Sequence, residues 1–191
     1  NYLFNGGFDK VSGGLPIYWT CTGDVSLINA TYVDQSFNKA LAFTPGVSDE
    51  ASISQSVALK PGKYTFSMPL YARNCLEAGA SFTVTEYGTT NVIHSAYIQT
   101  ENSSAGENRF FSTSFEIEGD AEYEKVTIAI TFSTTAYLAV SPYLEIDSLT
   151  LVKDVGVAKY NFVESGDFEN KLLGSNGTVL TVGTDCWTNQ S

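Results

Sequence analysis

The sequence is poor in charged side chains, histidine and cysteine, and it has no long apolar run. Only 16% of its 191 residues are charged, and 10 Lys and Arg against 21 Asp and Glu give a formal net charge of -11. This acidic balance excludes nucleic acid and anionic membranes as electrostatic partners, because both require a basic surface. No apolar run approaches the roughly 18 residues of a membrane-spanning helix. We therefore expect neither nucleic-acid binding nor membrane insertion.

Because cysteine and histidine are scarce, most metal sites and catalytic mechanisms that depend on these residues are not expected. Cys21, Cys75 and Cys186 do not have zinc-site spacing, and His94 is the single histidine, so a zinc site is not expected. The cysteines are either small buried apolar residues, or Cys21 and Cys75 form a disulfide. The nucleophile-elbow pattern Gly-x-Ser-x-Gly is absent, and the glutamates around the Gly119-Asp120 turn are typical of solvated charge. We therefore expect no enzyme active site.

Tyrosine, phenylalanine and small hydroxyl residues are abundant, and apolar residues recur with a period of two. The apolar content of 43% is ample for a packed core. Strict alternation between turn residues is typical of β-strands, and helical periodicity is absent. The pattern predicts an all-β fold, an antiparallel β-sandwich. The expected strands cover residues 40–44, 51–59, 63–73, 80–87, 92–99, 110–117, 125–132 and 143–152, and the polar stretch 100–108 is predicted to be a surface loop.

The alternation also assigns the two faces of each strand. Tyr64, Phe66 and Leu70 share one side of their strand, whereas Ser67 and Tyr71 take the other. Small polar side chains on an outer sheet face leave room for a ligand. They are also common on an ordinary solvated face, because Thr favours strands, and both interpretations remain open.

The opening of the chain occurs twice. Residues 1–9, Asn-Tyr-Leu-Phe-Asn-Gly-Gly-Phe-Asp, return as Asn-Phe-Val-Glu-Ser-Gly-Asp-Phe-Glu at 161–169. A return at a fixed offset marks a tandem array. We expect one complete module over residues 1–155, followed by a linker and the truncated start of a second module over 156–191. The tail is expected to pack against the complete module, or to exchange between chains, through Phe162, Val163 and Phe168 or through residues 179–182.

Three separated motifs resemble one family. The opening Asn-x-Leu-x-Asn-Gly-Gly-Phe-Asp with Pro16-Ile17-Tyr18-Trp19 is the first of them. The others are residues 55–67, Gln-Ser-Val-Ala-Leu-Lys-Pro-Gly-Lys-Tyr-Thr-Phe-Ser, and the closing segment 143–151, Tyr-Leu-Glu-Ile-Asp-Ser-Leu-Thr-Leu. Together they resemble jelly-roll carbohydrate-binding modules of the family 4, 9 and 22 (galactose-binding-like) type. The resemblance implies a jelly-roll sandwich over residues 1 to about 152.

The resemblance also implies a structural calcium. In such modules its ligands come from the acidic residue after the opening Gly-Phe and from an aspartate in the final strand, which correspond here to Asp9 and Asp147. Calcium prefers about six to eight oxygen ligands, and carboxylates from remote segments suit it. The alternative is a pair of solvated carboxylates at strand ends.

Sugar recognition in the resembling modules depends on aromatic rings that stack on the apolar faces of pyranoses. The outward phase of the strands nominates Tyr71, Tyr87 and Phe110, and Arg73, Tyr97, Tyr137 and Gln99 lie nearby in the pattern. The expected ligand-binding residues are Tyr71, Arg73, Tyr87, Tyr97 and Phe110. Taken singly, each tyrosine fits a half-buried strand residue better, and only their grouping favours a binding role; Trp19 and Trp187 fit a core role better.

These expectations define a function and one alternative. The chain is expected to be a non-catalytic module that binds a polysaccharide or oligosaccharide. It would belong to a secreted or cell-surface multimodular protein, bacterial in origin, with neighbouring modules as further partners. The alternative is a structural or adhesive spacer of the same fold without its own sugar site.

Overall fold

The computed structural model describes residues 1–33, 39–46, 49–75, 78–100, 106–134, 142–154, 171–173 and 179–181. The chain divides into two compact units, Asn1–Asp154 and Val155–Ser191. In the described ranges no residue is helical, and accordingly none forms a helix long and apolar enough to cross a membrane. The expectation of an all-β protein is confirmed.

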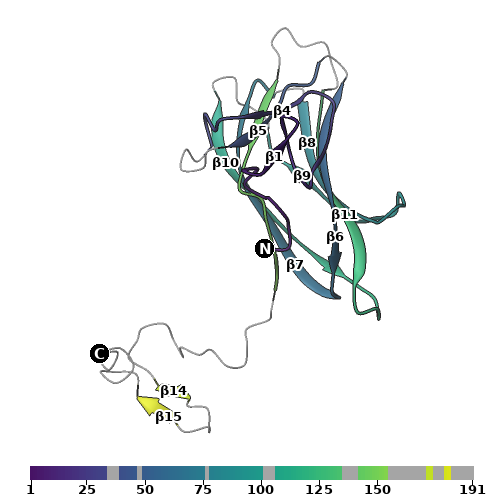
Figure 1. Ribbon diagram of the computed structural model, residues 1–191, viewed down its shortest axis with the longest axis vertical. Helices are drawn as coiled ribbons and strands as arrows, with labels where there is room; N and C mark the ends of the chain where they lie inside the picture. Colours follow the sequence, from purple (N-terminus) through teal and green to yellow (C-terminus); the bar gives the residue numbers. More distant parts are fainter. Residues whose placement is uncertain are drawn as a thin grey trace. The chain divides into compact units, whose positions relative to one another are not determined.

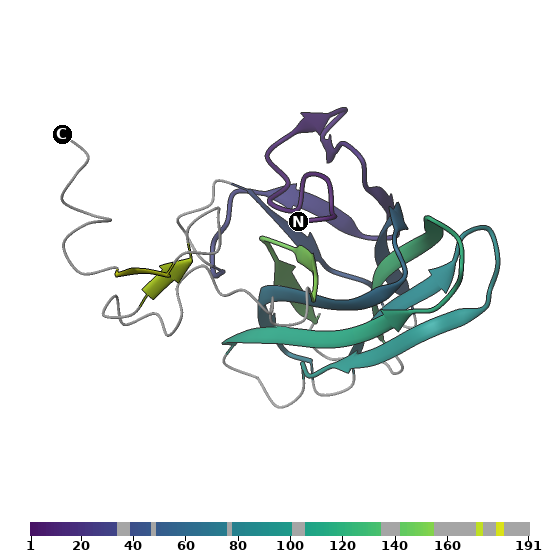
Figure 2. The same ribbon diagram turned by 90° about the horizontal axis from the view of Figure 1, so that it is seen from below.

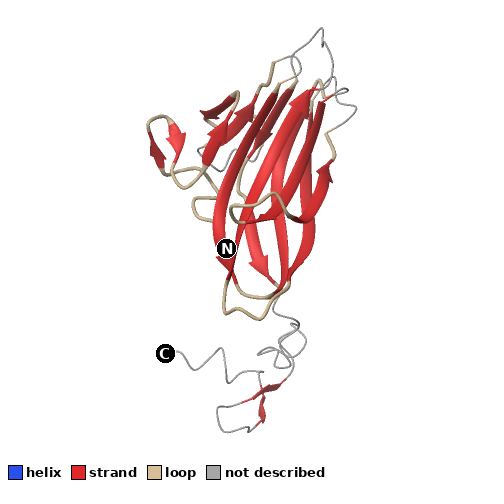
Figure 3. Cartoon of the chain, turned by 90° about the vertical axis from the view of Figure 1, so that its right-hand side faces the viewer, coloured by secondary structure: helices blue, strands red, loops and turns tan. Residues whose placement is uncertain are grey.

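The first unit is built from two antiparallel sheets (Figures 1 and 3). One sheet has the strand order β3-β6-β11-β8-β9, and the other has the order β10-β7-β12-β5-β4, with β13 also paired to β7. These strands are β3 (Thr20–Thr22), β4 (Val25–Ile28), β5 (Ala40–Phe43), β6 (Glu50–Leu59), β7 (Gly62–Arg73), β8 (Ala78–Glu86), β9 (Val92–Ile98), β10 (Glu107–Ile117), β11 (Glu124–Thr134), β12 (Tyr143–Ile146) and β13 (Thr150–Lys153). We call the two sheets the β6 sheet and the β7 sheet.

The core lies between the two sheets and is rich in aromatic rings. Phe66 from the β7 sheet and Phe82 from the β6 sheet are both fully buried, and their rings stack with centroids 4.3 Å apart. Ile128 from the β6 sheet and Leu144 from the β7 sheet also belong to the core, and both are fully buried. Each such side chain contributes about 1.5–3 kcal/mol of burial free energy. The alternation in the sequence thus gives the inner faces, as predicted.

The N-terminal segment lies against the last strand of the unit. The backbone N–H of Tyr2 donates to the carbonyl of Leu151 (2.8 Å), and that of Leu149 donates to the carbonyl of Gly6 (3.0 Å). A side chain at position 6 would collide with the Leu149 backbone, so glycine is required there. Trp19 is 7% exposed, and its indole N–H donates to the carbonyl of Asn5, in line with the core role expected for it.

The same segment carries a small hairpin that stands out from the two sheets (Figure 2). It consists of β1 (Val11–Ser12) and β2 (Leu15–Pro16). The Asn5 side chain accepts from the N–H of Lys10 and donates to the carbonyls of Lys10 and Ile17, which fixes the base of the hairpin.

Three local expectations are wrong. The predicted loop 100–108 ends early, because Glu107 and Asn108 already pair with β7. The predicted strand 143–152 is interrupted between Ile146 and Thr150, where Ser148 adopts a positive φ of 50°. Cys21 and Cys75 are free thiols, so the disulfide alternative does not hold.

In the second unit the structure describes only one antiparallel hairpin. β14 (Lys171–Leu173) pairs with β15 (Val179–Thr181). The other tail residues for which packing is predicted, Phe162, Val163, Phe168 and Val182, lie outside the described residues, as do Trp187, Cys186 and Tyr137.

Candidate functional site

A cluster of tyrosines covers one end of the outer face of the β7 sheet. Tyr71 of β7 stacks on Tyr32, with centroids 4.1 Å apart and an interplanar angle of 11°. Tyr143 of β12 meets both rings edge-on, at 6.0 Å from Tyr32 and 6.2 Å from Tyr71. Tyr71 therefore lies on the predicted outer face, but it is only 7% exposed because Tyr32 covers it. The ring offered to solvent is Tyr32, which is 38% exposed.

A buried glutamate holds the loop that carries Tyr32. One carboxylate oxygen of Glu145 accepts the backbone N–H groups of Thr31, Tyr32 and Val33 at 2.9, 3.0 and 3.2 Å. The other oxygen accepts the hydroxyl of Tyr143 at 2.8 Å. Glu145 is fully buried, and a buried carboxylate requires partners of this kind. The position of Tyr32 is thus set by β12.

The same environment acts on Tyr143. Burial, and then its hydrogen bond to Glu145, raises the pKa of the Tyr143 hydroxyl well above its ordinary value. The phenol therefore stays a neutral donor at ordinary pH, which keeps the Glu145 carboxylate satisfied.

Arg73 lies at the same end of the outer face of the β7 sheet as the tyrosine cluster. Its guanidinium lies 5.4 Å from the ring centroid of Tyr143 and 6.0 Å from that of Tyr32. Its Nε is buried without a hydrogen-bond partner in the described part of the chain. Cation–π contacts of this kind orient the planar group, and its remaining donors could serve a ligand.

Phe110 lies beside the cluster on the same face. It stands directly opposite Pro69 in the β10–β7 pair, and is therefore a diagonal neighbour of Tyr71 at roughly 7–8 Å. Its ring is 69% exposed, the largest exposed fraction among the large apolar side chains that the structure describes. Around it the outer face carries small hydroxyl groups, among them the hydrogen-bonded pair of Ser67 and Thr150 at 2.7 Å.

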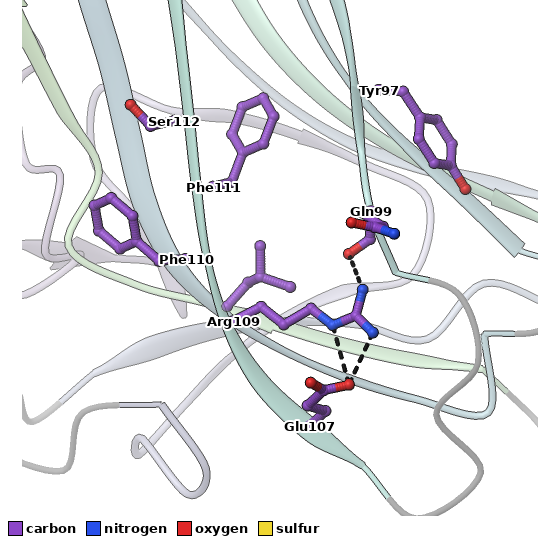
Figure 4. Close-up of a pocket in the computed structure, with 8 residues that line it drawn as sticks. Tyr97, Gln99, Glu107, Arg109, Phe110, Phe111 and Ser112 are labelled. Carbon is purple, nitrogen blue, oxygen red and sulfur yellow. Dashed lines mark hydrogen bonds and ion pairs between the residues drawn. The ribbon is translucent and has the colours of Figure 1, made fainter.

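A cleft opens where the edge strands of the two sheets, β9 and β10, diverge. Arg109 spans it, donating to the Gln99 carbonyl at 3.1 Å and forming an ion pair with Glu107 at 2.8 Å, whereas the ring of Phe110 lies on the other side of β10 (Figure 4). The cleft has a volume of about 640 Å³, within the range of ligand pockets. Its lining consists of Leu70, Tyr97, Gln99, Glu107, Arg109, Phe110, Phe111 and Ser112.

The predicted ligand-binding residues thus fall into three places. Tyr71 and Arg73 lie together in the tyrosine cluster, with Phe110 beside them. Tyr97 is 53% exposed and lines the cleft with Gln99 and Phe110, although it belongs to the β6 sheet. Tyr87 lies apart, just beyond the end of β8, with the Lys125 ammonium 5.2 Å from its ring centroid.

Sequence reasoning missed Tyr32, Tyr143 and Glu145. Tyr143 and Glu145 lie two residues apart in one strand, so the sequence pattern could have shown that they share a face. Nothing in the sequence places Tyr32 near them, because only the fold brings its loop over Tyr71.

The two predicted calcium ligands lie on segments that touch each other. Asp147 is fully buried and its Oδ1 accepts the N–H of Ser148 at 2.5 Å, whereas Asp9 is exposed. The hydroxyl of Ser148 is buried with no partner among the described residues. Those residues include no cluster of three or more His, Cys, Asp or Glu able to hold a metal. A calcium here would therefore need backbone carbonyls as well as the two carboxylates, which is ordinary calcium chemistry.

Comparison with solved structures places the fold. A carbohydrate-binding module of family 61, TmCBM61, solved in complex with β-1,4-galactotriose, is 21% identical and has a TM-score of 0.54. That match covers 81% of this chain and 99% of the module. A second module, family 16 carbohydrate-binding module-2, is 17% identical with a TM-score of 0.52, over 80% of this chain and all (100%) of that one.

An enzyme shares the architecture too. A cyclase from Fischerella sp. TAU, in complex with 4-(1H-indol-3-yl)butan-2-one, is 11% identical with a TM-score of 0.53, over 78% of this chain and 93% of the cyclase. No protein-family model and no curated protein sequence matches the chain. The chain therefore has the jelly-roll fold of carbohydrate-binding modules, as the resemblance implied, and that fold also supports catalysis elsewhere.

Proposed function

We propose that this chain is a non-catalytic glycan-binding module whose sugar surface is the outer face of the β7 sheet around Phe110. The observation that carries the proposal is the exposed ring of Phe110 on β10, on the same sheet face as Tyr32 and as the hydroxyl groups of Ser67 and Thr150. The likeness to carbohydrate-binding modules supports the proposal at the level of fold.

The arrangement suits the chemistry of a sugar chain. A pyranose has an apolar C–H face that stacks on an aromatic ring, and a rim of hydroxyl groups that need hydrogen-bond partners. Phe110 supplies the first, and the small hydroxyl side chains and the Arg73 guanidinium supply the second. Because these groups lie on strands or are tied to them, little ordering entropy is lost when a sugar binds. Tyr32 offers a second ring farther along the same face.

Affinity electrophoresis through gels containing β-1,4-galactan, xylan or a soluble cellulose derivative tests the proposal. We expect retardation in at least one gel, and a loss of affinity of about tenfold or more in Phe110→Ala, equivalent to about 1.4 kcal/mol. The matched control is Tyr123→Ala, which removes a ring that is 52% exposed elsewhere on the module. Equal retardation of both variants and the parent chain would place the sugar surface elsewhere. Tyr87→Ala, run in the same gels, tests whether Tyr87, which lies apart from the other predicted residues, contributes to binding.

We further propose that calcium binds where the N-terminal segment meets the bend between β12 and β13, with Asp9 and Asp147 as ligands. The Leu149 N–H donates to the Gly6 carbonyl and the Tyr2 N–H donates to the Leu151 carbonyl, which holds these two segments together. The carboxylate and carbonyl oxygens there are of the kind that calcium prefers as ligands. Asp147 is fully buried, and a calcium ion would attract a buried carboxylate strongly.

The setting proposed for the module is a secreted or cell-surface multimodular protein. The acidic composition and the recurrence of the opening motif at 161–169 support it. In that setting the module would bring its parent protein to a glycan, and neighbouring modules would supply any catalysis.

A further inference from the structure

The N-terminal segment presents a pair of aromatic rings to solvent. Phe4 and Tyr18 are each 60% exposed, and their ring centroids are 5.7 Å apart at an interplanar angle of 46°. In the part of the chain that the structure describes, no other pair of contacting aromatic rings has both members more than half exposed. Exposing two rings side by side forgoes burial free energy, so the pair calls for an explanation.

A single buried side chain fixes both residues. Gln55 of β6 is 4% exposed. Its Oε1 accepts the backbone N–H of Phe4 at 2.8 Å, and its Nε2 donates to the carbonyls of Phe4 and Tyr18 at 2.9 and 3.1 Å. Both backbones are thereby tied to β6, a long strand of the β6 sheet. The rings stand on a rigid base, which a binding platform requires.

The backbone of Tyr18 is strained. Its φ of 73° lies in the left-handed region, which is unfavourable for a residue with a Cβ. Such conformations persist only where the surrounding structure imposes them, and they cluster at functional sites. Here the Gln55 hydrogen bond and the burial of the adjacent Trp19 impose it, and the result is that the Tyr18 ring faces solvent beside Phe4.

The recurrence of the opening motif at 161–169 differs from its first occurrence at the position of Phe4. At the buried positions the copy keeps the residue type, with Val163 in place of Leu3 and Phe168 in place of Phe8. At the exposed position of Phe4 it has Glu164. The two occurrences of the motif therefore share the apolar residue types at the positions of Leu3 and Phe8, but they do not share an aromatic residue at the position of Phe4.

We propose that Phe4 and Tyr18 form a second sugar-stacking platform, specific for the apolar faces of neutral pyranoses and separate from the Phe110 surface. This inference rests on the proposed function in that it takes the module to be a glycan binder. The β3 edge that follows Tyr18 adds exposed hydroxyls such as that of Thr20. Phe110 lies on β10, at the opposite edge of the sandwich, so both surfaces can be occupied at once.

The size of the pair favours a sugar over a protein partner. Two aromatic side chains at 60% exposure offer on the order of 200–300 Å². A stable protein interface needs about 800 Å² from each partner, whereas one or two sugar rings cover no more than the pair offers.

The test counts sites by titrating the full chain with β-1,4-galactotriose, cellotriose and xylotriose, followed by nuclear magnetic resonance. For a trisaccharide that binds, we expect two sets of shifting resonances, one around Phe110 and one around Tyr18. Phe4→Glu, which reproduces the residue of the second copy, should remove the Tyr18 set and leave the other. Phe110→Ala should do the reverse, and the double variant should remove both. Phe4→Tyr keeps a ring and should keep both sets, as should Tyr123→Ala.

Each possible outcome supports or contradicts one of the two proposed sugar surfaces. If Phe110→Ala removes all binding and Phe4→Glu removes none, the second platform is wrong and the proposed function stands. If only the Tyr18 set appears, the second platform stands and the Phe110 surface is wrong. If no trisaccharide shifts either set, both are wrong. Concentration-dependent broadening without sugar, abolished by Phe4→Glu, would show that a second copy of the chain occupies the platform instead, which also overturns the inference.

Discussion

The imidazole of His94 and the hydroxyl of Thr113 join the edge strands of the two sheets, with Nε2 and Oγ1 2.9 Å apart. His94 lies on β9 and Thr113 on β10, and the His94 ring stacks on Phe115 with centroids 5.7 Å apart. The sequence's only histidine thus fastens the sandwich along the edge where the cleft opens, and it is a structural residue.

Replacing either member of this pair should weaken the sandwich. We expect Thr113→Val to lower the free energy of unfolding by about 1 kcal/mol, because it removes the hydrogen bond and keeps the shape. His94→Ala should cost about 2–3 kcal/mol, since the contacts with Phe115 are lost as well. Urea unfolding of both variants and of the double variant gives the coupling energy. Strict additivity would show that the hydrogen bond contributes nothing.

Glu145 should be essential to the position of Tyr32. Glu145→Ala leaves three backbone N–H groups and the Tyr143 hydroxyl without their acceptor, so the free energy of unfolding should fall by about 3 kcal/mol or more. Glu145→Gln keeps one acceptor oxygen and should cost less. Thermal unfolding measures both. Two variants of equal stability would mean that the carboxylate charge and its four bonds do not matter.

Stability should fall at alkaline pH through Tyr143. Its pKa is raised in the folded chain, so above the ordinary tyrosine pKa of about 10 the unfolded chain loses this proton while the folded chain keeps it. The contribution of this hydroxyl to folding stability is therefore fully present below about pH 10 and is lost progressively as the pH rises further. Because water reaches part of the ring, the pKa shift and the total loss of stability are smaller than for a fully buried group. The slope therefore stays below the roughly 1.4 kcal/mol per pH unit that a difference of one bound proton gives. In Tyr143→Phe the decline above pH 10 should be shallower in urea unfolding; an identical slope would contradict the assignment.

Gly106 should be intolerant of a side chain for two separable reasons. Its φ is +89°, and a Cβ there would run into the ring and hydroxyl of Tyr71. Gly88 has a similar φ of +73° and nothing within 4 Å, so Gly88→Ala reports the backbone strain alone, about 1 kcal/mol. Gly106→Ala should cost at least about 1 kcal/mol more in thermal unfolding. If the two substitutions cost the same, Tyr71 is not held as tightly as its stacking on Tyr32 indicates.

Calcium should stabilise the module. A ligand that binds only the folded chain raises stability by about 2.7 kcal/mol at a hundredfold excess over its dissociation constant. The melting temperature should therefore rise with added calcium and fall with chelator, and the effect should vanish in Asp147→Asn and weaken in Asp9→Asn. Glu118→Gln, which removes an exposed carboxylate elsewhere, is the matched control. A melting temperature indifferent to calcium and chelator would rule the site out.

The long strands were predictable from the sequence because each carries its own alternation of apolar and polar residues, whereas the short strands β3 and β4 were not predicted. β6, β7 and β11 begin and end within about two residues of the expected ranges. The break at Ser148 was not predictable, because it depends on the close approach of Gly6 to Leu149, 143 positions away.

The alternation also predicted that Tyr71 lies on the outer face of its sheet. It could not show that a loop from elsewhere would cover it, since the anchor of that loop is a buried glutamate on a third segment.

The same limit applies to the second aromatic platform. Pro16-Ile17-Tyr18-Trp19 marks a family-like opening, and from the pattern alone Tyr18 is no different from a core residue. Only the positive φ of Tyr18 and the reach of Gln55 turn its ring outward.

The contact between the first residues and the last strand has a mechanical consequence. Asn1 and Tyr2 bond to Leu149 and Leu151, so the chain enters the module beside the strand by which it leaves. A pull between Asn1 and Asp154 loads these few hydrogen bonds directly and leaves the long β6–β11 and β7–β10 ladders unloaded. In a protein pulled at both ends of this unit, the force would pass through the contact between its first and last segments, and both sheets would keep their pairing.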